Sequence, residues 1–404
     1  MITAPSSAPR ARTARRFDRI GGVVLGGDSQ GLGIARSLGR HGVPVCVIDD
    51  ETSISRASRF VQRTVRVRDL RSESSLLDAL ALARRRFGLP GWVLYPTRDE
   101  NVAALAANRD MLARDFRVPT PGLAAIRAVW DKRETYRLAE KWSIPIPRTW
   151  YPCSEADVAA IDVAGPLVVK PAIKEHFFYA THVKAWRADN RAELIAAFRR
   201  AAEIVGDGEV IVQELIPGGG NEQYAYCALF RAGHPVASMT VRRCRQHPSD
   251  FGRASTYVET ISLPDLGEPS IRFLREIGYY GLVELEFKHD VRNGTYKLLD
   301  VNARTWGYHS LGMRAGVDFP YLLYQDQLGN PVNEAHARPG VRWIRLTTDV
   351  PNAVRDITAR RLRARDYLGT LFSVNTEAVF SLRDPLPGLY ELALLPYLAV
   401  KRGL

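Results

Sequence analysis

Residues 281–304 read Gly281-Leu-Val-Glu-Leu-Glu-Phe-Lys-His-Asp-Val-Arg-Asn-Gly-Thr-Tyr-Lys-Leu-Leu-Asp-Val-Asn-Ala-Arg304. Two runs with alternating apolar residues flank the dipeptide Asn293-Gly294. An Asn-Gly dipeptide between alternating runs is the strongest short-range signal for a β-hairpin. We therefore predict two antiparallel strands joined by a turn at this dipeptide.

The predicted hairpin carries oxygen-bearing side chains. Glu286 lies before the turn at a distance that lets it oppose Asp300 or Asn302, which share a face of the returning strand. Two carboxylates and an amide oxygen suit a hard cation such as Mg²⁺, whose coordination is usually completed by substrate phosphates. Arg304, on the same face, adds a planar fork for phosphate oxygens. A solvated sheet face with scattered ion pairs is the alternative interpretation.

The pattern Glu-Phe, a turn and Asp-x-Asn-x-Arg resembles the metal-binding end of the ATP-grasp superfamily, and the resemblance extends over roughly residues 21–332. It is closest to carboxylate–amine ligase-like members, which activate a carboxylate as an acyl phosphate and pass it to an amine. The resemblance implies ATP and Mg²⁺, with Mn²⁺ as a substitute, and small-molecule carboxylate and amine substrates. Arg304 and Lys170 are the expected catalytic residues, because both would place positive charge on the reacting phosphates.

The chain, at 404 residues, is too long for a single hydrophobic core. The resemblance implies an α/β fold with α+β lobes, in which an ATP-grasp domain follows a Rossmann-like pre-ATP-grasp domain and precedes a C-terminal extension. The expected parts are a disordered arm (1–19), the pre-ATP-grasp domain (20–125), the ATP-grasp domain (126–335, with a nucleotide lobe at about 126–225 and a carboxylate and metal lobe at about 226–335) and the extension (336–404). In the extension we expect a strand near 341–346, a helix near 353–364 and a packed apolar helix at 389–400.

Composition narrows the class of protein. Hydrophobic residues make up 46% of the chain and charged residues 25%, as in ordinary soluble globular proteins. The net charge is +12, but no compact basic-aromatic motif accompanies it, so no nucleic-acid partner is expected. Four widely spaced cysteines predict neither a zinc site nor a disulfide framework and favour a cytoplasmic setting. No stretch approaches about 20 apolar residues, so neither a transmembrane helix nor an export signal is expected. The sequence leaves open whether the protein forms a homodimer.

Two lysines are expected to contact the phosphates of ATP. Lys170 ends an apolar strand, where a cation needs an anionic partner, and it matches the second lysine of the superfamily. Lys132 heads an amphipathic helix and matches the lysine that points at the phosphates in the superfamily. Without the resemblance, Lys132 would be a solvated residue at a helix end.

The nucleoside is expected to bind between the two lobes. Residues 209–218 resemble the adenine-binding hinge of the superfamily, which implies contacts from Gln213, Glu214 and Leu215 to the adenine. Glu222 matches the acidic residue that accepts the ribose hydroxyls. A turn carboxylate is the alternative role of Glu222.

Residues 172–184 depart from the superfamily pattern. Many relatives have a lid rich in Gly and Ser here, whose amides cover the phosphates, whereas this segment contains no glycine. Lys184, together with Lys174, His176 and His182, is expected to supply side-chain phosphate contacts instead. The run Phe177-Phe-Tyr179 is interpreted either as the tip of a lid or as packing.

A cation-rich segment at 242–252 is predicted to be a polar loop. Arg243 or Arg245 is a candidate for bidentate binding of a substrate carboxylate or phosphate. A basic surface loop is the alternative.

Two features near the N-terminus leave other functions open. Glycines at 26–33 and Asp49 follow strands of a β-α-β unit, but their spacing is out of register with the dinucleotide fingerprint. A nicotinamide-dependent oxidoreductase is therefore the runner-up, and a non-catalytic nucleotide-binding regulatory protein is the other rival. Asp99 follows a strand end, where it either faces a ligand or caps the next helix.

Overall fold

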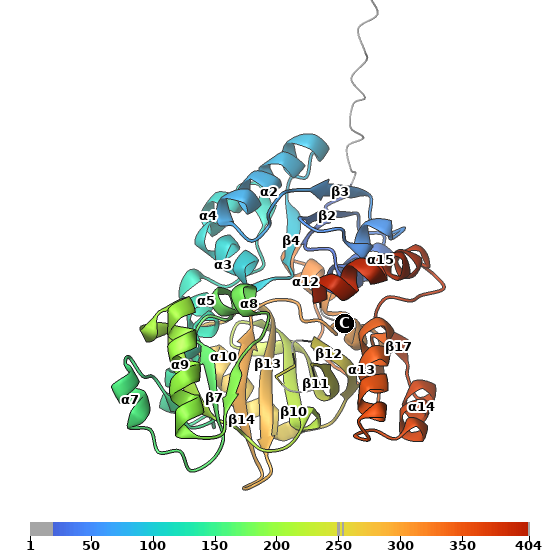
Figure 1. Cartoon of the computed structure of the whole chain (residues 1–404). Coiled ribbons are helices and arrows are strands. Elements are labelled where there is room, and N and C mark those ends of the chain that lie inside the picture. Colours follow the sequence, from blue (N-terminus) through green and yellow to red (C-terminus); the bar gives the residue numbers. More distant parts are fainter. Residues whose placement is uncertain (1–18, 249–250, 253, 403–404) are drawn as a thin grey trace, which may run out of the picture.

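Three β-sheets form the framework of the protein (Figure 1). The computed structural model describes residues 19–248, 251–252 and 254–402, so the arm expected at 1–19 lies outside the described residues except for Arg19. The first sheet has five strands, the second four and the third eight. The order of the elements agrees with the mixed α/β architecture predicted from the sequence.

The N-terminal sheet is parallel, with strand order β3-β2-β1-β4-β5. Its strands are β1 (Gly22–Leu25), β2 (Val45–Asp49), β3 (Arg63–Arg66), β4 (Trp92–Pro96) and β5 (Phe116–Arg117). Its helices are α1 (Ser29–Arg40), α2 (Glu73–Phe87), α3 (Asp99–Ala107) and α4 (Arg109–Leu112). Helix α1 packs on one face, and α2 and α3 pack on the other. Because both faces are covered, the central strands β1, β2 and β4 are buried along their whole length, and Cys46 on β2 is fully buried.

The segment predicted to be the nucleotide lobe contains the four-stranded sheet, with order β6-β9-β7-β8. Its strands are β6 (Thr149–Trp150), β7 (Leu167–Pro171), β8 (Trp186–Ala188) and β9 (Val210–Glu214). The helices of this region are α5 (Leu123–Trp130), α6 (Lys132–Lys141), α7 (Glu155–Ala159), α8 (Lys174–Thr181) and α9 (Arg191–Val205). Asp131 caps α6, because its side chain accepts a hydrogen bond from the Arg133 amide, and this cap fixes where the helix begins.

The eight-stranded sheet contains the predicted hairpin. Its path is β14-β13-β10-β11-β12-β16-β17, and β15 pairs with β11. The strands are β10 (Gln223–Arg231), β11 (His234–His247), β12 (Ala254–Thr260), β13 (Gly281–Asp290), β14 (Thr295–Asn302), β15 (Ala335–His336), β16 (Arg342–Ile344) and β17 (Thr376–Glu377). The hairpin β13–β14 is confirmed, although its loop spans residues 291–294 rather than the Asn-Gly pair alone.

The large sheet is buried on both faces. Helix α10 (Gly267–Glu276) covers one face. On the other face, one continuous apolar core joins the sheet to α1, α11 (Ser310–Ala315) and α12 (Phe319–Gln327). The N-terminal sheet is therefore held against the large sheet by a shared core, which fixes the position of the β1–α1 turn above β13 and β14.

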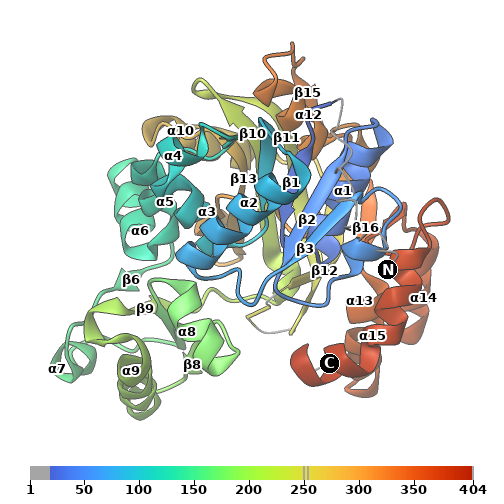
Figure 2. The same cartoon turned by 90° about the horizontal axis from the view of Figure 1, so that it is seen from above.

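The C-terminal segment completes the large sheet instead of standing apart from it. Strands β16 and β17 extend the sheet beyond β12, and helices α13 (Leu346–Thr358), α14 (Ala364–Phe372) and α15 (Leu386–Arg402) follow. The helix expected near 353–364 is wrong in its bounds, since α13 starts earlier and ends at Thr358. Figure 2 shows α13–α15 and the nucleotide lobe on opposite sides of the molecule. Among the described residues, no helix is long and apolar enough to cross a membrane.

Candidate active site

The two strands of the hairpin bring the predicted metal-binding residues together. Glu286 on β13 pairs directly with Asp300 on β14, and Glu284 pairs with Asn302. A β-bulge leaves Leu299 without a partner, so that Leu298 and Val301 both pack in the apolar core although they are three residues apart. The bulge thereby keeps Asp300 on the face of Glu286.

A cavity of about 530 Å³ opens over this face. Its walls come from the hairpin, from the lid segment, from the β1–α1 turn and from the C-terminal segment. The predicted residues that line it are Lys174, His182, Lys184, Arg243, Glu286, Asp300, Asn302 and Arg304. Eight predicted side chains, separated by up to 130 positions in the sequence, therefore meet at one cavity.

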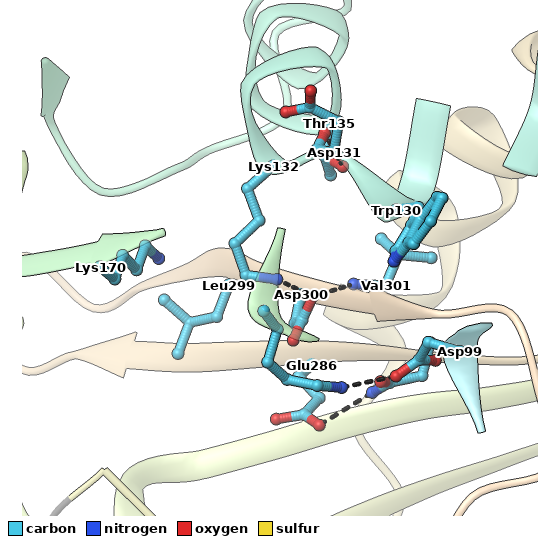
Figure 3. Close-up of polar contacts among 12 residues, drawn as sticks. Asp99, Trp130, Asp131, Lys132, Thr135, Lys170, Glu286, Leu299, Asp300 and Val301 are labelled. Carbon is cyan, nitrogen blue, oxygen red and sulfur yellow. Dashed lines mark hydrogen bonds and ion pairs between the residues drawn. The ribbon is translucent and has the colours of Figure 1, made fainter. Parts of the chain in front are cut away.

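Lys132 reaches this cluster from the start of α6. Its Nζ lies 2.8 Å from Oδ1 of Asp300, and Figure 3 shows it extending from the helix toward the strand. One turn further along α6, the Tyr136 hydroxyl donates to the Leu299 carbonyl at 2.7 Å. The first turn of α6 is thus fixed to the bulge of β14.

Lys170, at the end of β7, is a cation whose described hydrogen bonds go to neutral groups. Its Nζ donates to the Tyr136 hydroxyl and to Oε1 of Gln213, both at 2.7 Å. Burial, reinforced by the positive charge of Lys132, lowers the pKa of Lys170 to about 7. A desolvated ammonium that forms no ion pair with the described residues is a suitable site for an anionic ligand such as a phosphate.

The glycine-free lid segment forms a helix, α8, over most of its length. Lys184 lines the cavity beyond the end of α8, and burial lowers its pKa to about 8. Lys174 and His182 also line the cavity, and Nζ of Lys174 lies 2.5 Å from Asp99. His176 does not line it and contacts Glu209 at 2.7 Å. Phe177 is fully buried against Trp186, so its role is packing.

The residues expected at the adenine and ribose lie outside the 530 Å³ cavity. Glu214 forms ion pairs with Arg292 at 2.7 Å and Lys297 at 2.6 Å. Glu222 accepts a hydrogen bond from Nδ1 of His289 at 3.0 Å. The contacts of Gln213 and Leu215 are also within the protein, with the Leu215 amide donating to the Pro166 carbonyl. Their nucleotide roles stay predictions.

The polar loop predicted at 242–252 is wrong for its first half, because β11 continues through His247. The strand separates the two candidate arginines. Arg243 is buried and pairs with Glu286 at the cavity. Arg245 binds both oxygens of Asp349, at 2.9 and 2.8 Å, and its guanidinium lies over Tyr257. Arg243 is thus the cavity residue, whereas Arg245 fastens α13 to the sheet.

The donor set of the hairpin fits Mg²⁺ when substrate phosphates supply further oxygens. Within the described residues, no group of three or more His, Cys, Asp or Glu side chains has the arrangement of a metal site. Glu286 and Asp300 supply two opposed carboxylates, and Asn302 supplies an amide oxygen from the next position on the same face. Such a set is incomplete without a ligand, as is usual for Mg²⁺ in phosphate-binding sites.

Comparison with known proteins agrees with this geometry. Residues 226–348, which include the hairpin, match a family described as ATP-grasp in the biosynthetic pathway with Ter operon. A D-aspartate ligase from Enterococcus faecium (strain Aus0004) is 25% identical over 326 residues, which cover 76% of each chain. The chain therefore has the ATP-grasp fold, and its residues 226–348 match an ATP-grasp family.

Solved structures share the ATP-grasp fold. An L-amino acid ligase from Bacillus licheniformis aligns over 80% of this chain and 78% of its own, with a TM-score of 0.62 and 17% identity. A biotin carboxylase from Campylobacter jejuni aligns over 80% of this chain and 74% of its own, with a TM-score of 0.63 and 16% identity. At these identities, the likeness establishes the fold.

Arg304 has a partner that was not predicted from the sequence. Its Nε lies 2.8 Å from Oδ1 of Asp99, and its Nη2 donates to Oδ1 of Asn302 at 3.0 Å. The interpretation of Asp99 as a helix cap is wrong, because the N-cap of α3 is Arg98 and Asp99 is the first helical residue. Asp99 faces the active site instead.

Glu284 is a second residue that the sequence analysis did not assign to the site. It is buried and accepts hydrogen bonds from the Tyr308 hydroxyl and from Nδ2 of Asn302. Burial and the neighbouring Glu286 raise the pKa of Glu284 to about 7. The sequence could have indicated that Glu284 belongs to the site, because alternation puts Glu284 on the same face as Glu286.

The first β-α-β unit of the chain does not support a nicotinamide site. Oδ2 of Asp49 accepts a hydrogen bond from the Gly27 amide at 2.7 Å, and Arg98 contacts both Asp49 at 3.3 Å and Asp50 at 2.8 Å. The carboxylate that would bind a ribose is therefore engaged within the turn.

Proposed function

We propose that the protein activates a carboxylate with the γ-phosphate of ATP as an acyl phosphate and transfers the acyl group to an amine, releasing ADP and phosphate. The observation that carries this proposal is the meeting of two opposed carboxylates, Glu286 and Asp300, with the cations Lys132, Arg243 and Arg304 at one end of the cavity. This arrangement suits a triphosphate and a divalent cation better than any redox cofactor.

The cations have separate tasks in the proposal. Lys170 is the anchor for an ATP phosphate, because its described partners are neutral and its ammonium is desolvated. Lys132 lies beside Asp300 and Lys184 lines the same cavity, so both add positive charge near the phosphates. Gln213, Glu214, Leu215 and Glu222 are proposed to bind the nucleoside.

Glu286, Asp300 and Asn302 would hold Mg²⁺, which supplies charge stabilisation to the transferring phosphoryl group. Arg304 is placed to offset negative charge that develops during transfer, since its guanidinium is fixed by Asp99 and Asn302. Arg243 offers its planar fork to the carboxylate substrate. Positioning and charge account for the chemistry, so no protein nucleophile is required.

An amino acid is proposed as one of the two substrates. The names of two similar proteins, a D-aspartate ligase and an L-amino acid ligase, favour this class. The cavity extends from the hairpin to the β1–α1 turn, where Gly27 and Asp28 line it, and this leaves room for a small acceptor beside the nucleotide.

The experiment is a screen of the whole chain with ATP, Mg²⁺ and pools of amino acids and amines, read out as ADP release. Hydroxylamine added in place of the amine should trap the acyl phosphate as a hydroxamate. Asp300→Asn should abolish both signals, and Asp265→Asn, which alters an exposed carboxylate outside the cavity, should retain them. ATP binding without turnover in any pool would favour the regulatory alternative, and ADP release that is independent of any carboxylate would contradict the proposal.

A further inference from the structure

The first turn of α3 touches two parts of the active site at once. Asp99 accepts from Nε of Arg304 at 2.8 Å through Oδ1, and from Nζ of Lys174 at 2.5 Å through Oδ2. Lys174 is the first residue of α8, the helical part of the lid. A single carboxylate of the N-terminal domain therefore joins the lid to the arginine of the metal-binding strand.

The next residue of α3 makes a second contact with the same helix. Oε1 of Glu100 accepts from the Tyr179 hydroxyl at 2.6 Å, and the guanidinium of Arg71 lies 4.2 Å from the centre of the Tyr179 ring. Lys174 and Tyr179 lie near opposite ends of α8, so the helix is fastened along its length rather than at one point.

A third contact fixes the orientation of α8. Oε2 of Glu175 accepts from Nε1 of Trp130 at 2.9 Å, and Oε1 of Glu175 lies 3.1 Å from Nζ of Lys174. Trp130 ends α5, outside the sheet of the nucleotide lobe. Helix α8 thus belongs to the nucleotide lobe by sequence, while several of its polar side chains are bound by other parts of the chain.

We propose that Asp99 and Glu100 form a latch that holds α8 closed over the active site, and that Asp99 is a positioning residue that orients Arg304 when Lys174 is docked. The proposal rests on the proposed ligase function for its catalytic consequence. The latch comprises Asp99 and Glu100 on α3 with Lys174 and Tyr179 on α8.

The composition of the lid explains why a latch of side chains is needed. A segment without glycine cannot easily bring its own amides over the phosphates, so closure has to be stabilised elsewhere. Ion pairs in a partly buried site with few waters are stronger than those on an open surface. The side chains of Asp99 and Lys174 are 15% and 25% exposed, so their contact lies in such a site.

Because Asp99 binds both Lys174 and Arg304, the position of α8 is coupled to the orientation of Arg304. When α8 opens, Lys174 leaves Asp99 and water enters beside Arg304, so the guanidinium loses its fixed orientation. When α8 closes, Arg304 is held by Asp99 and Asn302 together, and water is excluded from the reacting phosphate. The latch therefore links water exclusion to the placement of the charge that stabilises phosphoryl transfer.

The test uses hydrogen exchange of residues 172–184 in the full chain with saturating Mg-ADP, which requires no knowledge of the substrates. Tyr179→Phe and Glu100→Gln should each increase exchange in this segment about tenfold, and Asp99→Asn should do the same. Glu209→Gln is the matched control, because it removes the contact of His176 on α8 to its own lobe and leaves the latch intact. Unchanged exchange in Tyr179→Phe and Glu100→Gln would overturn the latch.

Measurements of turnover distinguish a positioning role of Asp99 from a simple loss of structure. With an identified substrate pair, Tyr179→Phe should increase ADP release that is not accompanied by product, because an open lid admits water. Asp99→Asn should in addition lower kcat, and Asp99→Glu should restore part of it. Equal kcat in Asp99→Asn and Tyr179→Phe would contradict the role of Asp99 on Arg304. A failure of all substrates would contradict the ligase function and leave the exchange result on the latch standing.

Discussion

Nζ of Lys132, the first residue of α6, lies 2.8 Å from Oδ1 of Asp300 on β14. The two residues are 168 positions apart, so the pair joins the proposed nucleotide lobe to the strand that is proposed to hold the metal. The contact has a chemical consequence as well, because Lys132 shares the carboxylate that is proposed to hold Mg²⁺. ATP and the metal would therefore bind to groups that are already held near one another.

Removing this cation should impair turnover. We expect Lys132→Met to lower kcat by roughly a hundredfold, since one charge that stabilises the reacting phosphates is lost. Lys141→Met is the matched control, because Lys141 lies exposed at the other end of the same helix. Steady-state ADP release provides the measurement, and an equal effect of the two substitutions would refute a specific role for Lys132.

The pH dependence of ATP binding should report on Lys170. In the free protein its pKa is lowered to about 7, mainly by burial, so the ammonium is lost as pH rises through this value. Phosphate favours the charged form, hence the dissociation constant of ATP should rise above pH 7 by up to about tenfold per pH unit. Calorimetry in two buffers should show proton uptake on ATP binding at pH 8.

Lys170→Met supplies the control for this titration. The variant should bind ATP more weakly and should lose the additional proton uptake, because the titrating ammonium is absent. Proton uptake that persists unchanged in the variant would show that another group is responsible.

The two arginines of β11 should differ in what their loss affects. Arg245→Met leaves Asp349 buried without its ion-pair partner, so the free energy of unfolding should fall by about 3 to 5 kcal/mol. Arg243→Lys keeps a positive charge beside Glu286 but removes the planar fork, so KM for the carboxylate should rise with a small change in stability. Chemical denaturation and kinetics of both variants distinguish the roles, and the reverse pattern would contradict them.

Nucleotide preference tests the interpretation of the N-terminal sheet. Mg-ATP should raise the melting temperature, since it binds the folded state, and NADH at the same concentration should not. The reason is that Asp49 is engaged by the Gly27 amide and Arg98. Stabilisation by NADH alone would favour the oxidoreductase.

Local patterns were sufficient to predict the centre of the site. Alternation placed Glu286 and Asp300 on adjacent strands, and an amphipathic run headed by Lys132 predicted the helix α6. Both patterns relate residues that are close together in the sequence, so they can be recognised from one sequence without a structure. The bulge at Leu299 was not predicted, because it follows from the register of two strands rather than from one run.

Long-range contacts were not accessible in the same way. Asp99 looked like a helix cap because its local sequence suits one, and its contact with Arg304 joins residues 205 positions apart. Arg243 and Arg245 looked alike in a cation-rich run, and only their opposite partners, Glu286 and Asp349, distinguish them. Strands β16 and β17 are too short to be predicted as members of a sheet whose other strands lie far earlier in the chain.

The central claim is that β13 and β14 hold a divalent cation together with a nucleotide, and it is tested most directly by Mn²⁺ binding in the presence of saturating ADP, counted by electron paramagnetic resonance. The account predicts that Asp300→Asn and Glu286→Gln each weaken Mn²⁺ binding by at least about tenfold, whereas Asp265→Asn leaves it unchanged. Mn²⁺ affinity that is equal in all three variants and the unaltered chain would contradict the account.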